Sequence, residues 1–266
     1  MPPSACDTHM HIYDPRYPFA PGAVITPPPA TVADYRTLQQ RLGLERVVIV
    51  QPSGYGLDNS CTLYATAALG KNARCVVVVD DKATDAELER LTKAGARGIR
   101  FFMLPGGILP WSILERMADR VRVFGWHVQL QLDGRQLPDH EAMLMRLRGT
   151  LVVDHVGKYL EPVPPTHAAF LSLLRLLETG RTWVKLSAPY ETSKLGPPLY
   201  GDVGELAKHL VRVAPDRMVW ASNWPHPSVT NKPDDAMVLD LLLDWAPDEA
   251  VRRRILTDNP AALYGF

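Results

Sequence analysis

The chain has 266 residues, of which 46% are hydrophobic and 22% charged, and its 29 basic residues balance 29 acidic ones. This composition is typical of a soluble globular protein, and the zero net charge argues against nucleic acid or an anionic membrane surface as a partner. No stretch approaches the ~20 apolar residues of a membrane span. Three widely spaced cysteines and no basic-then-apolar leader favour a reducing compartment, so we expect a cytoplasmic protein.

Eight short runs rich in valine, isoleucine and leucine predict β-strands. Uninterrupted apolar runs of this kind are typical of strands that are covered on both faces, as in a parallel sheet. The predicted strands are residues 5–11, 46–51, 74–79, 98–103, 126–132, 150–155, 183–187 and 218–222.

Segments with helical periodicity lie between and after these runs: residues 32–42, 61–69, 85–94, 112–124, 139–148, 168–179, 203–213 and 234–245. Residues 248–266 predict a terminal helix pair. Six helices are followed by a glycine where a left-handed residue would close them: Gly43, Gly70, Gly95, Gly125, Gly149 and Gly180. Eight strand–helix units with short connections predict one domain, residues 1–266, folded as a (β/α)8 TIM-type barrel. An open doubly wound sheet is the alternative, but no Gly-x-Gly-x-x-Gly follows the first strand.

Polar side chains collect where the predicted strands end, which is the working face of such a barrel. His9 and His11 alternate along the first strand and therefore share a face. Imidazoles from strands one and six, with cations from strands four, six and seven, predict a pocket for a small anion with a polarisable carbonyl. The candidates are His9, His11, Ser53, Tyr55, Arg100, His155, Lys158, Tyr190, Lys194, Asn223 and His226.

Three motifs resemble the amidohydrolase superfamily. They are Asp-Thr-His-Met-His at 7–11, Val-Asp-His-Val-Gly-Lys at 153–158 and Ser-Asn-Trp-Pro-His-Pro at 222–227. Within it, the chain is most similar to the group of 2-pyrone-4,6-dicarboxylate lactonase and D-galactarolactone isomerase. Gln-Pro-Ser at 51–53 resembles the lactonase branch, and Leu-Pro-Gly-Gly at 104–107 the isomerase branch. The resemblance implies a distorted barrel acting on a carboxylated lactone without bound metal.

The residue types also bear on a metal cofactor. His9, His11 and His155 offer three zinc ligands. However, the resemblance places Asn223 where metal-dependent relatives carry a ligating aspartate, and Gln131 where they carry a histidine. Neutral amides are poor zinc ligands, so we expect no metal, with zinc at the three histidines as the alternative.

The expected reaction is hydrolysis of a small anionic lactone. We expect the three histidines to stabilise the oxyanion and cationic side chains to bind the carboxylate, and a third group to orient the substrate. The three histidines are His9, His11 and His155. The cationic side chains are Arg100, Lys158 and Lys194, and the orienting group is Ser53, Tyr55 and Tyr190. Asn223 would position the attacking water, with His155 or His226 as proton acceptor.

Asn223 is the main difficulty for hydrolysis. The resemblance implies that the lactonase uses an aspartate there as general base, and an asparagine cannot accept a proton near neutral pH. Hydrolysis is preferred because both first-strand histidines are present. Lactone isomerisation, in which a substrate hydroxyl attacks, is the alternative. A non-catalytic binding protein and a metal-dependent decarboxylase are further alternatives, and the sequence does not indicate the oligomeric state.

Overall fold

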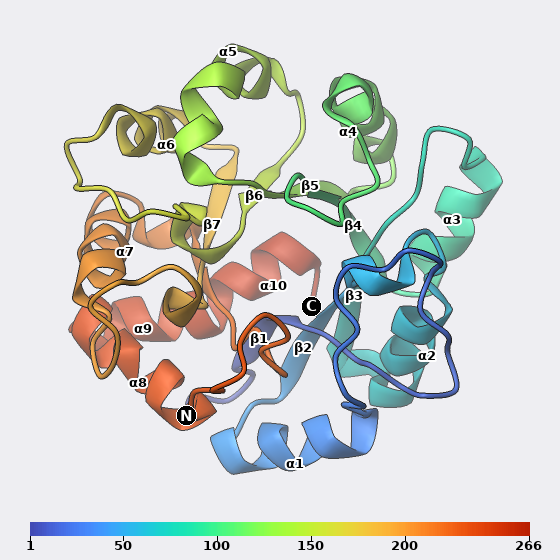
Figure 1. Cartoon of the computed structure of the whole chain (residues 1–266), viewed down its shortest axis with the longest axis horizontal. Helices are drawn as coiled ribbons and strands as arrows, with labels where there is room; N and C mark the ends of the chain where they lie inside the picture. The colour runs from blue at the N-terminus through green and yellow to red at the C-terminus, as the bar shows by residue number, and fades with distance from the viewer.

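The computed structural model describes residues 1–266 and contains one sheet of eight parallel strands that follow one another in chain order. This confirms the predicted (β/α)8 architecture (Figure 1). The strands are β1 (Cys6–Met10), β2 (Arg46–Val50), β3 (Ala73–Val77), β4 (Ala96–Phe102), β5 (His127–Gln131), β6 (Leu151–Val153), β7 (Thr182–Leu186) and β8 (Met218–Trp220).

The helices surround the strands, and α10 lies across one end of the barrel (Figure 1). They are α1 (Val32–Leu42), α2 (Ser60–Leu69), α3 (Asp85–Lys93), α4 (Leu114–Arg122), α5 (Leu137–Arg146), α6 (Ala168–Glu178), α7 (Gly201–Val213), α8 (Asp235–Trp245), α9 (Glu249–Leu256) and α10 (Asp258–Tyr264). Five of the six predicted closing glycines have positive φ, but Gly149 does not, because α5 ends at Arg146 and leaves it in the connection to β6. None of the helices is long and apolar enough to cross a membrane.

The barrel closes irregularly between β1 and β8. The amide of Asn223 donates to the carbonyl oxygen of His9 at 2.9 Å, and the amide of His11 donates to that of Trp224 at 2.8 Å. The Thr8 hydroxyl adds a bond to the carbonyl oxygen of Trp220 at 2.9 Å. This seam is the distortion that the resemblance implies, and it brings the segment after β8 against the end of β1.

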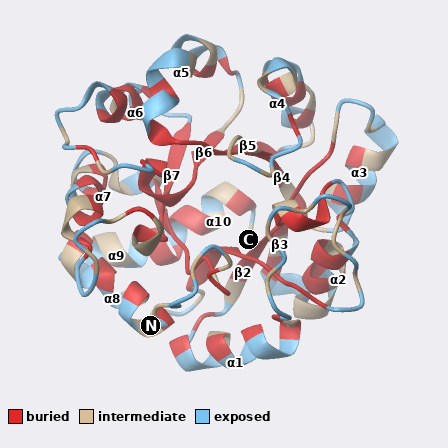
Figure 2. Ribbon diagram, in the orientation of Figure 1, coloured by how far each residue is buried: buried red, intermediate tan, exposed pale blue.

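The apolar core lies mainly between the strands and the helices, whose outward faces are exposed (Figure 2). A smaller apolar cluster fills the amino-terminal end of the barrel, where Tyr264 of α10 is fully buried. It packs with Cys6, Val48, Val50 and Val76. The predicted site residues lie toward the opposite, carboxyl-terminal end of the strands, whereas His127, at the start of β5, is buried against Tyr264.

Candidate active site

A cavity of about 340 Å³ lies at the carboxyl-terminal ends of the strands. Its position is the one expected for the active site of a barrel of this type. Six of the predicted residues line it, from five different strand–loop units: His11, Ser53, Arg100, His155, Lys158 and Asn223.

The other five predicted residues do not line the cavity: His9, Tyr55, Tyr190, Lys194 and His226. Lys194 is 60% exposed and forms an ion pair with Glu161 at 3.3 Å, so its charge is directed to the outer surface. The Tyr55 hydroxyl accepts a bond from the amide of Asp14, which gives it a role in holding a loop.

The three predicted imidazoles meet at one place. The ring centroid of His9 lies 4.9 Å from that of His11 and 4.9 Å from that of His155. Nδ1 of His11 lies 2.8 Å from the carbonyl oxygen of Val50, which can only accept, so this nitrogen carries the proton. Nε2 of His11 then accepts from Nε2 of His9 at 3.2 Å. The two first-strand histidines are therefore bonded to each other.

All three imidazoles are neutral at neutral pH. Burial, reinforced by the charge of Arg100, lowers the pKa of His11 to about 3. Burial also holds the pKa values of His9 and His155 well below their ordinary range. Nδ1 of His155 lies 2.8 Å from the Ser187 hydroxyl, which leaves Nε2 for a ligand. His155 is thus suited to hydrogen bonding in its neutral form, and it is a poor proton acceptor.

Lys185 of β7 lies fully buried beneath the histidines. Its ammonium donates to Oε1 of Gln129 at 2.7 Å and to the carbonyl oxygen of Thr8 at 2.9 Å. It also lies 3.3 Å from Nδ1 of His9 and 3.6 Å from Oδ1 of Asp154. Burial lowers the pKa of Lys185 to about 8, so the ammonium is still mainly charged at neutral pH.

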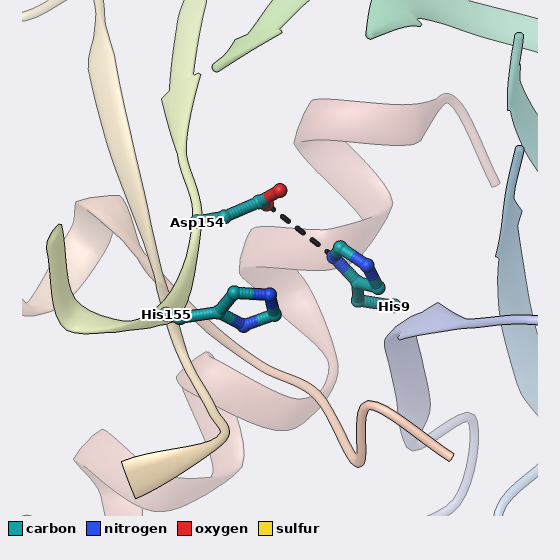
Figure 3. Close-up of side chains that lie close together, drawn as sticks. All are labelled: His9, Asp154 and His155. Atoms are coloured by element: carbon teal, nitrogen blue, oxygen red, sulfur yellow. Dashed lines mark ion pairs between the residues drawn. The ribbon is translucent and has the colours of Figure 1, made fainter. Parts of the chain in front are cut away.

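One group of side chains has the spacing of a metal site. The ligand atoms of His9, Asp154 and His155 lie within 4.8 Å of one another, and the side chains point toward a common space (Figure 3). The ammonium of Lys185, however, already contacts His9 and Asp154. A divalent cation on the same donors would lie beside this positive charge, which opposes its binding. The charge of Lys185 therefore acts against a divalent metal at these three donors.

Glu191 is the one acidic side chain that lines the cavity, and it was not among the residues predicted for the site. One carboxylate oxygen pairs with the ammonium of Lys158, and both side chains are less than 10% exposed. The other accepts from the Ser228 hydroxyl and lies 3.2 Å from Nδ2 of Asn223. The signal in the sequence was Tyr-Glu-x-Ser, which begins three residues after the end of the seventh predicted strand.

A chain of hydrogen bonds fixes the orientation of the Asn223 amide. Its Nδ2 donates to the hydroxyl of Tyr190 at 3.0 Å and to Glu191 at 3.2 Å, which uses both hydrogens. The Tyr190 hydroxyl donates to Nδ1 of His226 at 2.7 Å, and Nε2 of His226 donates to Asp235 at 3.1 Å. His226 is thus engaged on both nitrogens outside the cavity. Oδ1 of Asn223 is left as an acceptor for a ligand.

Comparison with known proteins places this site in a family. The family model described as amidohydrolase matches residues 6–266. The chain belongs to the amidohydrolase family. This confirms the resemblance shown by the three motifs.

Two curated relatives of this amidohydrolase are close in length as well as in sequence. It is 40% identical to D-galactarolactone isomerase of Agrobacterium fabrum, over 99% of this chain and 91% of the relative. It is 35% identical to 4-sulfomuconolactone hydrolase of Hydrogenophaga intermedia, over 100% and 90%. A crystal structure from Agrobacterium tumefaciens, also 40% identical, superposes with a TM-score of 0.95 over 100% of this chain and 97% of that one.

The backbone of this amidohydrolase is strained around its cavity. His155, Lys158, Asn223 and His226 have φ values of 55°, 47°, 60° and 58°. Left-handed backbone costs residues other than glycine about 1–3 kcal/mol each, and it concentrates at functional sites. The left-handed backbone at these positions gives the side chains directions that differ from those at an extended strand end.

Proposed function

We propose that this amidohydrolase hydrolyses a small lactone that carries a carboxylate. The observation that carries the proposal is the meeting of His155, Arg100, Asn223 and Glu191 in one cavity of about 340 Å³. These residues supply a neutral donor, a cation, a polar acceptor and a carboxylate. The names of the two curated relatives, an isomerase and a hydrolase of lactones that carry an acidic group, support the same substrate class.

Arg100 is the cation best placed to bind the substrate carboxylate. Its guanidinium donates to the carbonyl oxygen of Gln51 and to Oε1 of Gln131, both at 2.8 Å. These partners orient it without neutralising it, whereas the charge of Lys158 is paired with Glu191. A charge-assisted hydrogen bond to a carboxylate is roughly twice as strong as a neutral one.

The lactone carbonyl would be activated by His155. A hydrogen bond from its neutral ring to the carbonyl oxygen stabilises the oxyanion that forms when a nucleophile adds. Oδ1 of Asn223 would accept a hydrogen from the attacking water. His9 and His11 would support this arrangement through their mutual bond and their packing against His155.

The reaction proposed here needs no metal. The ammonium of Lys185 supplies a fixed positive charge beneath the imidazoles, in contact with two of the three side chains that have metal-site spacing. The oxyanion would instead be stabilised by hydrogen bonds from the protein.

Isomerisation is the second candidate. In that reaction a hydroxyl of the substrate attacks in place of water, and the ring closes at a different position. It is favoured by the neutral Asn223, which does not itself accept a proton, and by the 40% identity to a lactone isomerase. The two reactions share the addition step at the carbonyl.

The test is incubation of the purified protein with a panel of lactones bearing one or two carboxylates, in weakly buffered solution. Hydrolysis releases acid and produces the ring-opened hydroxy acid, both of which we expect to detect by pH-stat titration and NMR. A changed lactone spectrum without acid release would assign isomerisation instead. Absence of both for every lactone would refute action on this substrate class.

A further inference from the structure

Addition of water to a carbonyl requires a group that takes up a proton. Among the side chains that line the cavity, Arg100 and Lys158 are cations, and Asn223 has no basic site. His11 and His155 have strongly lowered pKa values and stay neutral. Burial raises the pKa of Tyr13, so its hydroxyl stays protonated and is not a base. Glu191 is the remaining titratable group.

The contacts of Glu191 place it beside the position assigned to the nucleophile. One carboxylate oxygen lies 3.2 Å from Nδ2 of Asn223, a residue that lines the cavity and whose Oδ1 has no hydrogen-bond partner within the protein. A water has two hydrogens. When Oδ1 of Asn223 accepts one and Glu191 accepts the other, both lone pairs of the water remain free for the carbonyl carbon.

We propose that Glu191 is the general base, and then the general acid, of the lactone reaction; this inference rests on the proposed function. The oxygen of water forms a bond to the carbonyl carbon while its proton passes to Glu191, and the carbonyl π electrons become the oxyanion. The bond between that carbon and the ring oxygen then breaks, and the proton passes from Glu191 to the ring oxygen. The product is a hydroxy acid that ionises in water.

The ion pair with Lys158 supports both steps. Before the reaction, the ammonium and the Ser228 hydroxyl hold the carboxylate in place. When Glu191 takes up the proton, its negative charge is replaced by that of the oxyanion, so the net charge of the cavity does not change. Lys158 then faces a neutral carboxylic acid, and its positive charge stabilises the oxyanion.

The test is Glu191→Gln, which keeps the size of the side chain and removes its basicity. We expect kcat to fall by about 10²–10⁴-fold, the usual range for general acid–base catalysis. KM should stay constant or fall, because Lys158 is no longer neutralised and attracts the anionic substrate. We expect the wild-type rate to fall as the pH decreases, and this fall should be absent from E191Q.

The matched control is Glu141→Gln, which removes an ion pair with Arg175 between α5 and α6, outside the cavity. It should keep wild-type kinetics. Glu191→Asp keeps a carboxylate and should retain both the acid limb of the pH profile and measurable turnover, even where E191Q is unstable.

Two results would overturn the assignment of Glu191 while leaving lactone chemistry intact. One is an E191Q variant whose kcat lies within threefold of the kcat of an active wild type. The other is an E191D variant without an acid limb, beside a wild type that has one. A wild type that turns over no lactone would overturn the proposed function itself, and the role of Glu191 with it.

Discussion

Restoring the aspartate that hydrolytic relatives are expected to carry on strand eight should impair this protein when it is done alone. In Asn223→Asp, a carboxylate oxygen would replace Nδ2, which lies 3.2 Å from Glu191. Two like charges at that distance repel by about 5 kcal/mol at an effective dielectric constant of about 20. This repulsion opposes the ionisation of both carboxylates at once, and Lys158 offsets only part of it.

The consequence is a proton shared by the two carboxylates at neutral pH. We expect N223D to show at least tenfold lower kcat/KM at pH 7 and an acid limb displaced to higher pH. The double variant N223D/E191Q has a single carboxylate again. Its pH profile should return toward that of the wild type, and its rate should exceed that of either single variant.

The assay is kcat/KM between pH 5 and 9 for the wild type, the two single variants and the double variant, with folding checked by circular dichroism. A single variant N223D that hydrolyses lactone faster than the wild type at pH 7, with its acid limb unmoved, would refute the coupling of the two positions.

Three further outcomes are expected. The folded-state pKa of Lys185, about 8, lies below its ordinary value of 10.5. The wild type should therefore gain up to about 3 kcal/mol of unfolding free energy relative to Lys185→Met as the pH rises from 8 to 10.5. If urea titrations show a constant difference between the two proteins across that range, this expectation is wrong. Tyr190→Phe removes the hydroxyl that holds the amide of Asn223. It should lower kcat about tenfold and the unfolding free energy by about 1–2 kcal/mol. Unchanged kinetics would show that the orientation of the amide does not matter. Dialysis against a chelator should leave the wild-type rate unchanged, and loss of activity that zinc restores would contradict the metal-free proposal.

The strands were predictable because their valine-rich runs are buried on both faces, but their ends were not. The sixth strand was expected to reach residue 155 and ends at Val153, because His155 adopts a positive φ. The eighth was expected to reach residue 222 and ends at Trp220. There the amide and hydroxyl of Ser222 donate to Asp7 in place of a ladder partner.

The sequence predicted which strand ends carry the site residues, but not which of these side chains reach the cavity. Alternation correctly puts His9 and His11 on one face, yet positions two residues apart differ by roughly 6.6 Å along the strand. Only His11 reaches the cavity. Glu191 was given no role from the sequence, because the conformation of the segment after β7 follows from contacts with Lys158 and Ser228 that are distant in sequence.

The packing of Tyr264 beneath Cys6, Val48, Val50 and Val76 has a consequence for biosynthesis. A ribosome releases the first two strands more than two hundred residues before α10, the helix that covers the apolar space under them. Until α10 emerges, the nascent chain exposes that space to water and to chaperones. Burial of that apolar space must therefore wait until α10 has left the ribosome.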